Sequence, residues 1–122
     1  MSIAEDSVQF NTMKYYVVRI SIGRFDSNKI DTVKRALDAA EDKLAPGIRT
    51  MKENRGFFAG IDGESYSMVN VSFWDSVAAA KQMEQFQPML ELAKEFIGIG
   101  VRFERPILNF EPLWTIEQKE PI

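Results

Sequence analysis

The chemically richest stretch of the sequence is residues 65–76, Ser-Tyr-Ser-Met-Val-Asn-Val-Ser-Phe-Trp-Asp-Ser. Its residues alternate in character, as they do when successive side chains of a β-strand point to opposite faces. One side carries Val69, Val71 and Phe73, which are typical of a core. The other side mixes a phenol, a thioether, an amide, a hydroxyl and an indole, on Tyr66, Met68, Asn70, Ser72 and Trp74. Such a strand is expected where both faces of a sheet are covered and one face also recognises a molecule.

The sequence contains no histidine and no cysteine. The usual general base, the commonest zinc and haem ligand, and the Ser-His and Cys-His nucleophile pairs are therefore excluded. Disulfides and thiolate metal sites are excluded for the same reason. The acids Glu91, Glu95 and Glu104 do not have a spacing typical of metal ligands, and they are expected on a solvated face. We therefore expect neither a metal site nor a cofactor.

Length and composition indicate one globular domain. The chain has 122 residues, of which 45% are hydrophobic and 27% are charged, and this size is sufficient to bury a core. Fifteen basic residues are spread among 18 acidic ones, which argues against nucleic acid as a partner. No apolar run approaches the roughly 20 residues that cross a bilayer. The first 11 residues lack the pattern of a secretory signal, so a cytoplasmic location is expected.

The first half of the chain predicts a strand followed by a helix. Residues 15–25 alternate with period two, which indicates a strand. Apolar residues then recur every three or four positions, which is typical of one helix face, at Ile30, Val33, Leu37, Ala40 and Leu44. Pro46 and Gly47 are predicted to break this helix. Pro46 would then begin a short second helix that carries Ile48 and Met51 and is closed by Gly56.

The second half predicts a hairpin, a helix and further extended chain. Residues 57–62 and 65–74 are expected to pair across the turn Gly63-Glu64-Ser65. Asp75 or Ser76 is expected to cap a helix that Pro88 interrupts and Gly98 and Gly100 end. Residues 99–105 alternate like a fourth strand, and residues 107–114 form another extended apolar segment.

The order β-α-β-β-α-β predicts an α+β domain with a ferredoxin-like antiparallel sheet and both helices on one face, since helical crossovers are right-handed. We place an N-terminal arm at residues 1–13, the domain at residues 14–114 and a C-terminal tail at residues 115–122.

The uncovered face of this sheet predicts a homodimer. The second face would carry Val17, Met68 and Trp74 beside polar residues, whereas a solvated face would alternate cleanly between apolar and polar residues. Residues 107–114 are also too apolar for a free tail and could lie across a partner. We therefore predict that two sheets pack face to face.

Three features of the sequence together resemble a known superfamily. They are the strand order, the Trp74-Asp75-Ser76 step into the second helix and the Pro46-Gly47 pair late in the first helix. In these features, residues 14–114 resemble the dimeric α/β-barrel superfamily, and within it the branch of antibiotic-biosynthesis monooxygenases. The resemblance implies two ferredoxin-like sheets paired into a barrel. It also implies oxidation of a small aromatic or apolar molecule without a cofactor.

The resemblance also implies a site, because an Asn and a Trp on the sheet of such enzymes help to hold an aromatic substrate. Asn70 and Trp74 match them, and their spacing of four puts both on one side of the strand. Tyr66 is the third candidate catalytic residue. Candidate substrate-binding residues are Arg19, Arg102 and Met68. With no histidine available, Tyr66 or Glu104 would have to act as base.

The alternative is a homodimer that binds a small ligand, or has a structural role, without catalysis. In that case Trp74 fills the core at the end of its strand, and Asn70 satisfies neighbouring backbone. The methionines and phenylalanines would then be ordinary core residues.

Overall fold

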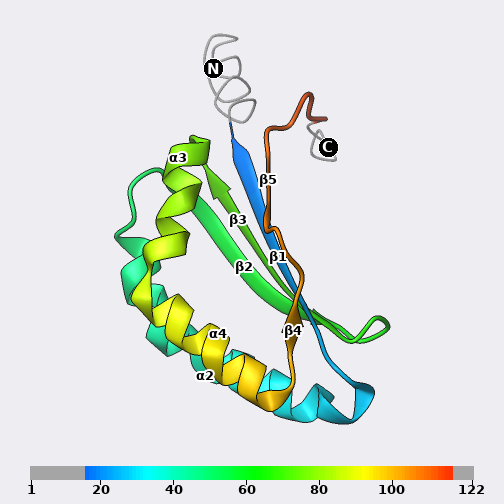
Figure 1. Cartoon of the computed structure of the whole chain (residues 1–122). Coiled ribbons are helices and arrows are strands. Elements are labelled where there is room, and N and C mark those ends of the chain that lie inside the picture. The colour runs from blue at the N-terminus through cyan, green and yellow to red at the C-terminus, as the bar shows by residue number, and fades with distance from the viewer. Residues whose placement is uncertain (1–15, 117–122) are drawn as a thin grey trace, which may run out of the picture.

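The computed structural model describes residues 16–116. The expected N-terminal arm, residues 1–13, lies outside this range, as does most of the tail, residues 117–122. The described chain forms one antiparallel sheet with helices on one side (Figure 1). Its elements in order are β1 (Val17–Arg24), η1 (Ser27–Lys29), α2 (Ile30–Arg49), β2 (Asn54–Asp62), β3 (Ser67–Trp74), α3 (Val77–Ala80), η2 (Lys81–Gln85), α4 (Gln87–Ile99), β4 (Arg102–Phe103) and β5 (Leu108–Phe110).

The sheet has the strand order β2-β3-β1-β4, and β5 also pairs with β1. Strand β1 is therefore central: β3 pairs along one edge, while β4 and β5 share the other edge. Strand β2 lies at the free edge beyond β3. Helices α2 and α4 lie on the same face (Figure 1). The predicted ferredoxin-like fold is confirmed.

Helix α2 runs unbroken to Arg49, so the predicted break at Pro46 is wrong. A proline removes one helical hydrogen bond, but continuing the helix buries Ile48 on the same stripe as Val33, Ala40 and Leu44. Gly47 lets the last turn approach α4: a Cβ there would lie 2.5 Å from the ring of Phe86. The helix ends at Thr50, whose backbone N–H and hydroxyl both donate to the carbonyl of Gly47.

The second helical region has three parts. The Ser76 hydroxyl accepts from the backbone N–H of Ala79 at 3.0 Å and caps α3, as the sequence predicts. The 3-10 turn η2 follows, and α4 starts with Pro88 in its first turn. Gly98 lies inside α4, and Gly100, with φ of 120°, ends it. The predicted fourth strand is shorter than expected, because Ile99 still belongs to α4.

The two sheet faces are the reverse of the sequence prediction. The mixed face, with Val17, Arg19, Met68, Ser72 and Trp74 buried, lies under the helices. The face that is apolar along most of its length, with only the terminal pair of Arg24 and Ser67 polar, points away from them. Its paired positions are Val18, Ile20 and Ile22 on β1 with Phe73, Val71 and Val69 on β3. Both faces read as partly apolar in the sequence, so alternation alone could not say which one the helices cover.

We call the apolar side the open face, because no helix within residues 16–116 covers it. Phe58 on β2 extends this face and packs edge-on against Phe73, with ring centroids 5.9 Å apart. On β5, Leu108 and Phe110 pair with Ile20 and Val18 and so join it. Exposure is high for Phe58 (63%), Leu108 (53%) and Phe110 (46%). Among residues 16–116, no helix has the length and hydrophobicity to cross a membrane.

Candidate functional site

A cavity of about 240 Å³ lies between the mixed face of the sheet and helices α2 and α4. Its floor is polar: Arg19 and Ser21 come from β1, and Asn70 and Ser72 come from β3. Its roof and ends are mostly apolar, and include Leu37, Leu44, Phe57, Met68, Met83, Met89, Leu92, Phe96, Phe103 and Ile107. An apolar cavity with a few convergent polar groups is the usual form of a small-molecule site.

Strand register places the polar floor residues in two rows across the sheet. Ser72 pairs with Arg19 on one side and with Phe57 on the other. In the next row, Asn70 pairs with Ser21 and with Ala59. Paired residues share a face, and neighbouring strands are about 5 Å apart. The floor is therefore a small polar patch with Arg19 at one end and Phe57 at the other.

Arg19 is buried, with 6% of its surface exposed. Its Nη1 donates to Asn109 Oδ1 at 3.2 Å and lies 3.8 Å from Glu84 Oε2. Burial lowers the pKa of Arg19, Glu84 opposes that shift, and nearby Arg105 adds to it. A guanidinium is not deprotonated in proteins. The cavity wall therefore carries a cation that is poorly solvated and only partly neutralised.

Asn70 Oδ1 is buried and accepts no hydrogen bond from the described chain. Trp74 is fully buried, but its Nε1 donates to Ser72 Oγ at 2.8 Å and its ring does not line the cavity. This bond leaves the Ser72 proton free to point elsewhere. Asn70 thus offers an acceptor that lacks a donor, and Trp74 acts on the cavity only through Ser72.

The cavity brings together half of the six site residues predicted from sequence: Arg19, Met68 and Asn70 line it directly. Tyr66 lies in the β2–β3 turn, with φ of 52°, and packs against Phe25. Arg102 is exposed and reaches Asp26. Glu104, the other suggested base, receives a hydrogen bond from Arg24 Nε at 2.6 Å. None of these last three residues lines the cavity.

Three residues at the Arg19 end were not identified from the sequence. Glu84 comes from η2, Arg105 follows β4 and Asn109 lies in β5. They are far from Arg19 in the sequence and belong to segments with no distinctive motif. Only the pairing of β5 with β1 places Asn109 opposite Arg19. Within residues 16–116, no group of three or more histidine, cysteine or acidic residues is arranged to hold a metal.

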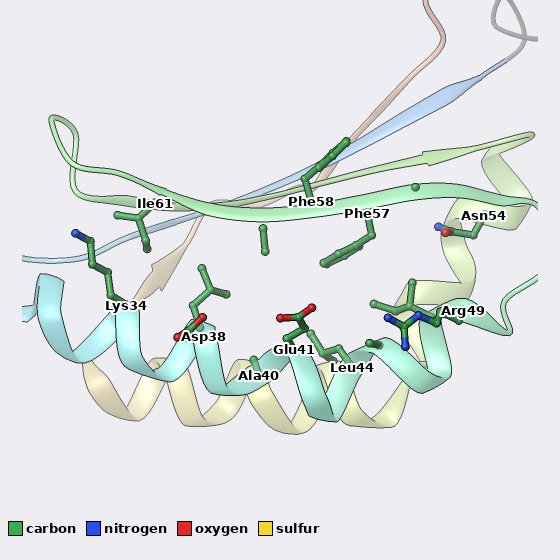
Figure 2. A pocket seen from close by; sticks show the side chains of 15 residues that line it. Lys34, Asp38, Ala40, Glu41, Leu44, Arg49, Asn54, Phe57, Phe58 and Ile61 are labelled. Atoms are coloured by element: carbon green, nitrogen blue, oxygen red, sulfur yellow. The ribbon is translucent and has the colours of Figure 1, made fainter.

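A wider groove of about 650 Å³ lies on the outer side of this cavity, between α2 and β2 (Figure 2). Apolar residues form most of it, and charged residues of α2 rise along one rim, namely Lys34, Asp38, Glu41 and Arg49. Asn54 Nδ2, at the start of β2, is buried here without an acceptor in the described chain. The opposite boundary is the free edge of β2.

Solved structures share this fold. A monooxygenase from Streptomyces coelicolor in complex with nanaomycin D is 14% identical, with a TM-score of 0.69 over 91% of this chain and 99% of that one. A candidate antibiotic biosynthesis monooxygenase from Deinococcus radiodurans is 11% identical, with a TM-score of 0.65 over 85% and 99%. No family model and no curated protein matches the sequence. The predicted resemblance to antibiotic-biosynthesis monooxygenases is therefore confirmed for the fold.

Proposed function

We propose that each subunit binds a small aromatic or apolar molecule in the inner cavity and oxidises it with dioxygen, without a cofactor. The observation that carries this proposal is the unpartnered Asn70 Oδ1 beside the buried Arg19 in an otherwise apolar cavity. Buried polar groups without partners cost free energy. A ligand with a hydroxyl group would supply the missing donor. The fold shared with monooxygenases supports the same reaction class.

The chemistry requires an electron-rich substrate, because the substrate itself must reduce dioxygen. An enolisable ketone with an activated CH₂ group meets this need. The CH₂ group loses both hydrogens and becomes a second C=O, one oxygen atom enters the product, and the other leaves as water. All four electrons that reduce dioxygen come from this carbon, whose two C–H bonds are replaced by the C=O bond. A water-poor cavity favours the reaction, because charge on the enolate is then stabilised by fixed groups.

The lining residues suggest a role for each polar group. Asn70 Oδ1 accepts a hydrogen bond from the hydroxyl of the substrate's enol form, and Arg19 stabilises the enolate oxygen that remains after this proton is lost. Glu84 is the one carboxylate that lines the cavity among the described residues, so we assign it as the proton acceptor. Met68 packs against the apolar body of the substrate, and Trp74 positions Ser72 through its hydrogen bond. Tyr66 and Arg102 are given no role.

We also propose that the working unit is a homodimer, with the open faces of two sheets packed together. The face places Ile20, Val71 and Phe58 in one row, and its positions on β1 and β3 are apolar except at the β4 end, where Arg24 pairs with Ser67. Burying one such side chain fully is worth roughly 1.5–3 kcal/mol. The exposed segment after β5, with Leu113 at 94% and Trp114 at 75% exposure, supplies further apolar surface for a partner.

Oxygen uptake with anthrone, a tricyclic ketone with an activated CH₂ group, tests the oxidation. We expect uptake above the uncatalysed rate, and a loss of roughly tenfold or more in kcat/KM for Asn70→Ala, since one hydrogen bond to a reacting group is removed. Asn28→Ala, at an exposed position in η1, is the matched control and should keep full activity.

The competing function is ligand binding without catalysis. It is favoured if anthrone binds, as measured by fluorescence quenching, but oxygen uptake stays at the uncatalysed rate for the unaltered protein. Equal activity of the Asn70→Ala and Asn28→Ala proteins would remove Asn70 from the proposed site.

A further inference from the structure

The inner cavity and the β2 groove share one wall. Leu37, Ala40 and Leu44 of α2 and Phe57 of β2 line both hollows. Figure 2 shows Phe57 pointing from β2 toward α2, whereas Phe58 points to the other side of the sheet. Because its ring lies between the two hollows, Phe57 closes the β2 end of the inner cavity.

The opposite end of the cavity carries net positive charge. Arg19, Arg105 and Glu84 all line it, which leaves one cation in excess. Glu84 has 54% of its side chain exposed and sits 3.8 Å from Arg19, so water weakens this pair. Among residues 16–116, Arg105 donates only to the Glu104 carbonyl, and its guanidinium lies over the ring of Phe103, at 5.2 Å. A carboxylate on the ligand would complete the neutralisation of the buried Arg19, and such charge-assisted hydrogen bonds are strong.

We infer that the cavity takes an elongated organic acid whose carboxylate pairs with Arg19 and whose apolar end stops at Phe57. The inference rests on the proposed function in one respect only, namely that the cavity is a ligand site. Arg19 and Phe57 stand in one cross-strand row with Ser72 between them, so their backbones are about 10 Å apart. The size of residue 57 therefore sets the length of the ligand.

Both ends of the site can be tested with straight-chain acids from hexanoate to dodecanoate and the matching alcohols. Calorimetry below their micelle concentrations gives the affinity of each. Each added CH₂ should tighten binding by roughly fourfold, up to the length that reaches Phe57, after which the gain should stop. Alcohols of equal length should bind roughly tenfold more weakly or worse, because they lack the charge-assisted pair.

Variants at position 57 move the length limit. Phe57→Ala should extend the fourfold gain to longer acids, because the cavity then opens into the groove, and Phe57→Trp should end it at shorter ones. Phe58→Ala is the matched control, since this neighbour lies on the opposite face, and its limit should equal that of the unaltered protein.

Arg19→Met keeps the apolar stem and should erase the difference between acids and alcohols. Arg105→Gln, at an exposed position, should reduce the difference in affinity between acids and alcohols. This variant tests the charged end of the site if Arg19→Met does not fold.

The inference is overturned if acids and alcohols bind equally, or if the length limit is the same with alanine, phenylalanine and tryptophan at position 57. These probes have no enolisable CH₂ between activating groups, so they report on the inference alone. Anthrone oxidation without selective binding of the acids would reject the inference and keep the proposed function. The reverse pattern would keep the inference and reject the oxidation.

Discussion

At the scale of single residues, the candidate site consists of polar groups that the rest of the fold does not satisfy. Asn70 Oδ1 has no donor within the described chain, and Arg19 keeps its charge with a partly exposed acid and an amide as neighbours. Neither arrangement benefits the folded state by itself, since buried polar groups are favourable only when paired. Their presence together in one cavity is best explained by a ligand that pairs with them.

This explanation predicts the stability of two neighbouring variants. Asn70→Ala removes an acceptor that has no donor, so the free energy of unfolding should change by no more than about 0.5 kcal/mol. Ser72→Ala, two residues along on the same face, leaves the buried Trp74 Nε1 without its acceptor and should cost about 1–3 kcal/mol. Urea unfolding followed by tryptophan fluorescence measures both. An equal loss in the two variants would make Asn70 a structural residue.

At the scale of elements, the sequence predicted the helices and strands better than their ends. Amphipathic spacing identified α2, and alternation identified β1 and β3, because each buries a face of fixed period. The predicted break at Pro46 failed because the tertiary contact of Gly47 with Phe86 and the burial of Ile48 favour a continuous helix. Those contacts join α2 to the start of α4, and the local sequence does not contain them.

The Gly47 contact can be tested against a second helical glycine. Gly47→Ala places a methyl group within 2.5 Å of the Phe86 ring and should destabilise the protein by about 1–3 kcal/mol, as overpacking does. Gly98→Ala, inside α4, meets no atom within 4 Å and should be neutral or stabilising by up to about 1 kcal/mol. Thermal unfolding of both variants measures this. A stable Gly47→Ala protein would contradict the account of α2.

The β2–β3 turn predicts a pH dependence. Two hydrogen bonds lower the pKa of Asp62 from its usual value of 3.8. The larger effect comes from the Ser65 hydroxyl and the smaller from the Glu64 backbone N–H. A carboxylate whose pKa is lower in the folded state adds stability above the unfolded value, and this stability is lost as the pH falls through the folded value. Asp62→Asn should therefore be less stable than the unaltered protein near neutral pH, and the difference should shrink below pH 3.8. Denaturant titrations across this range test it, and a difference that does not vary with pH would contradict it.

At the scale of the whole molecule, the sequence predicted that the helices cover one sheet face and a partner covers the other, but it assigned the wrong face to the helices. The mixed face lies under α2 and α4, where its polar groups line the cavity, while the open face is apolar along β1 and β3 up to the terminal pair of Arg24 and Ser67. The residues Glu84, Arg105 and Asn109 could not be predicted, since only the folded chain brings η2, β4 and β5 to Arg19. Asn70 was a candidate because the family resemblance implies an Asn on the sheet, and the period of its strand placed it on the same side as Met68 and Trp74.

The open face predicts the effect of a charge at its centre. Val71 lies between Ile20 and Phe58 in the register. Val71→Lys should convert the proposed dimer to a monomer, because a buried unpaired charge opposes association. Ala39→Lys, on the exposed side of α2, should leave the dimer intact. Light scattering after gel filtration gives the mass, and circular dichroism checks the fold. A folded Val71→Lys dimer would contradict the proposed interface.

The most direct test of the central claim is native mass spectrometry of the purified protein with anthrone or decanoate added. A ligand site under the helices of each subunit, with the open faces packed together, predicts a dimer that takes up one ligand per subunit. A single ligand per dimer would instead place the site between the two sheets. A monomer would contradict the proposed covering of the open face, and a dimer that binds neither molecule would contradict the assignment of the cavity as a ligand site.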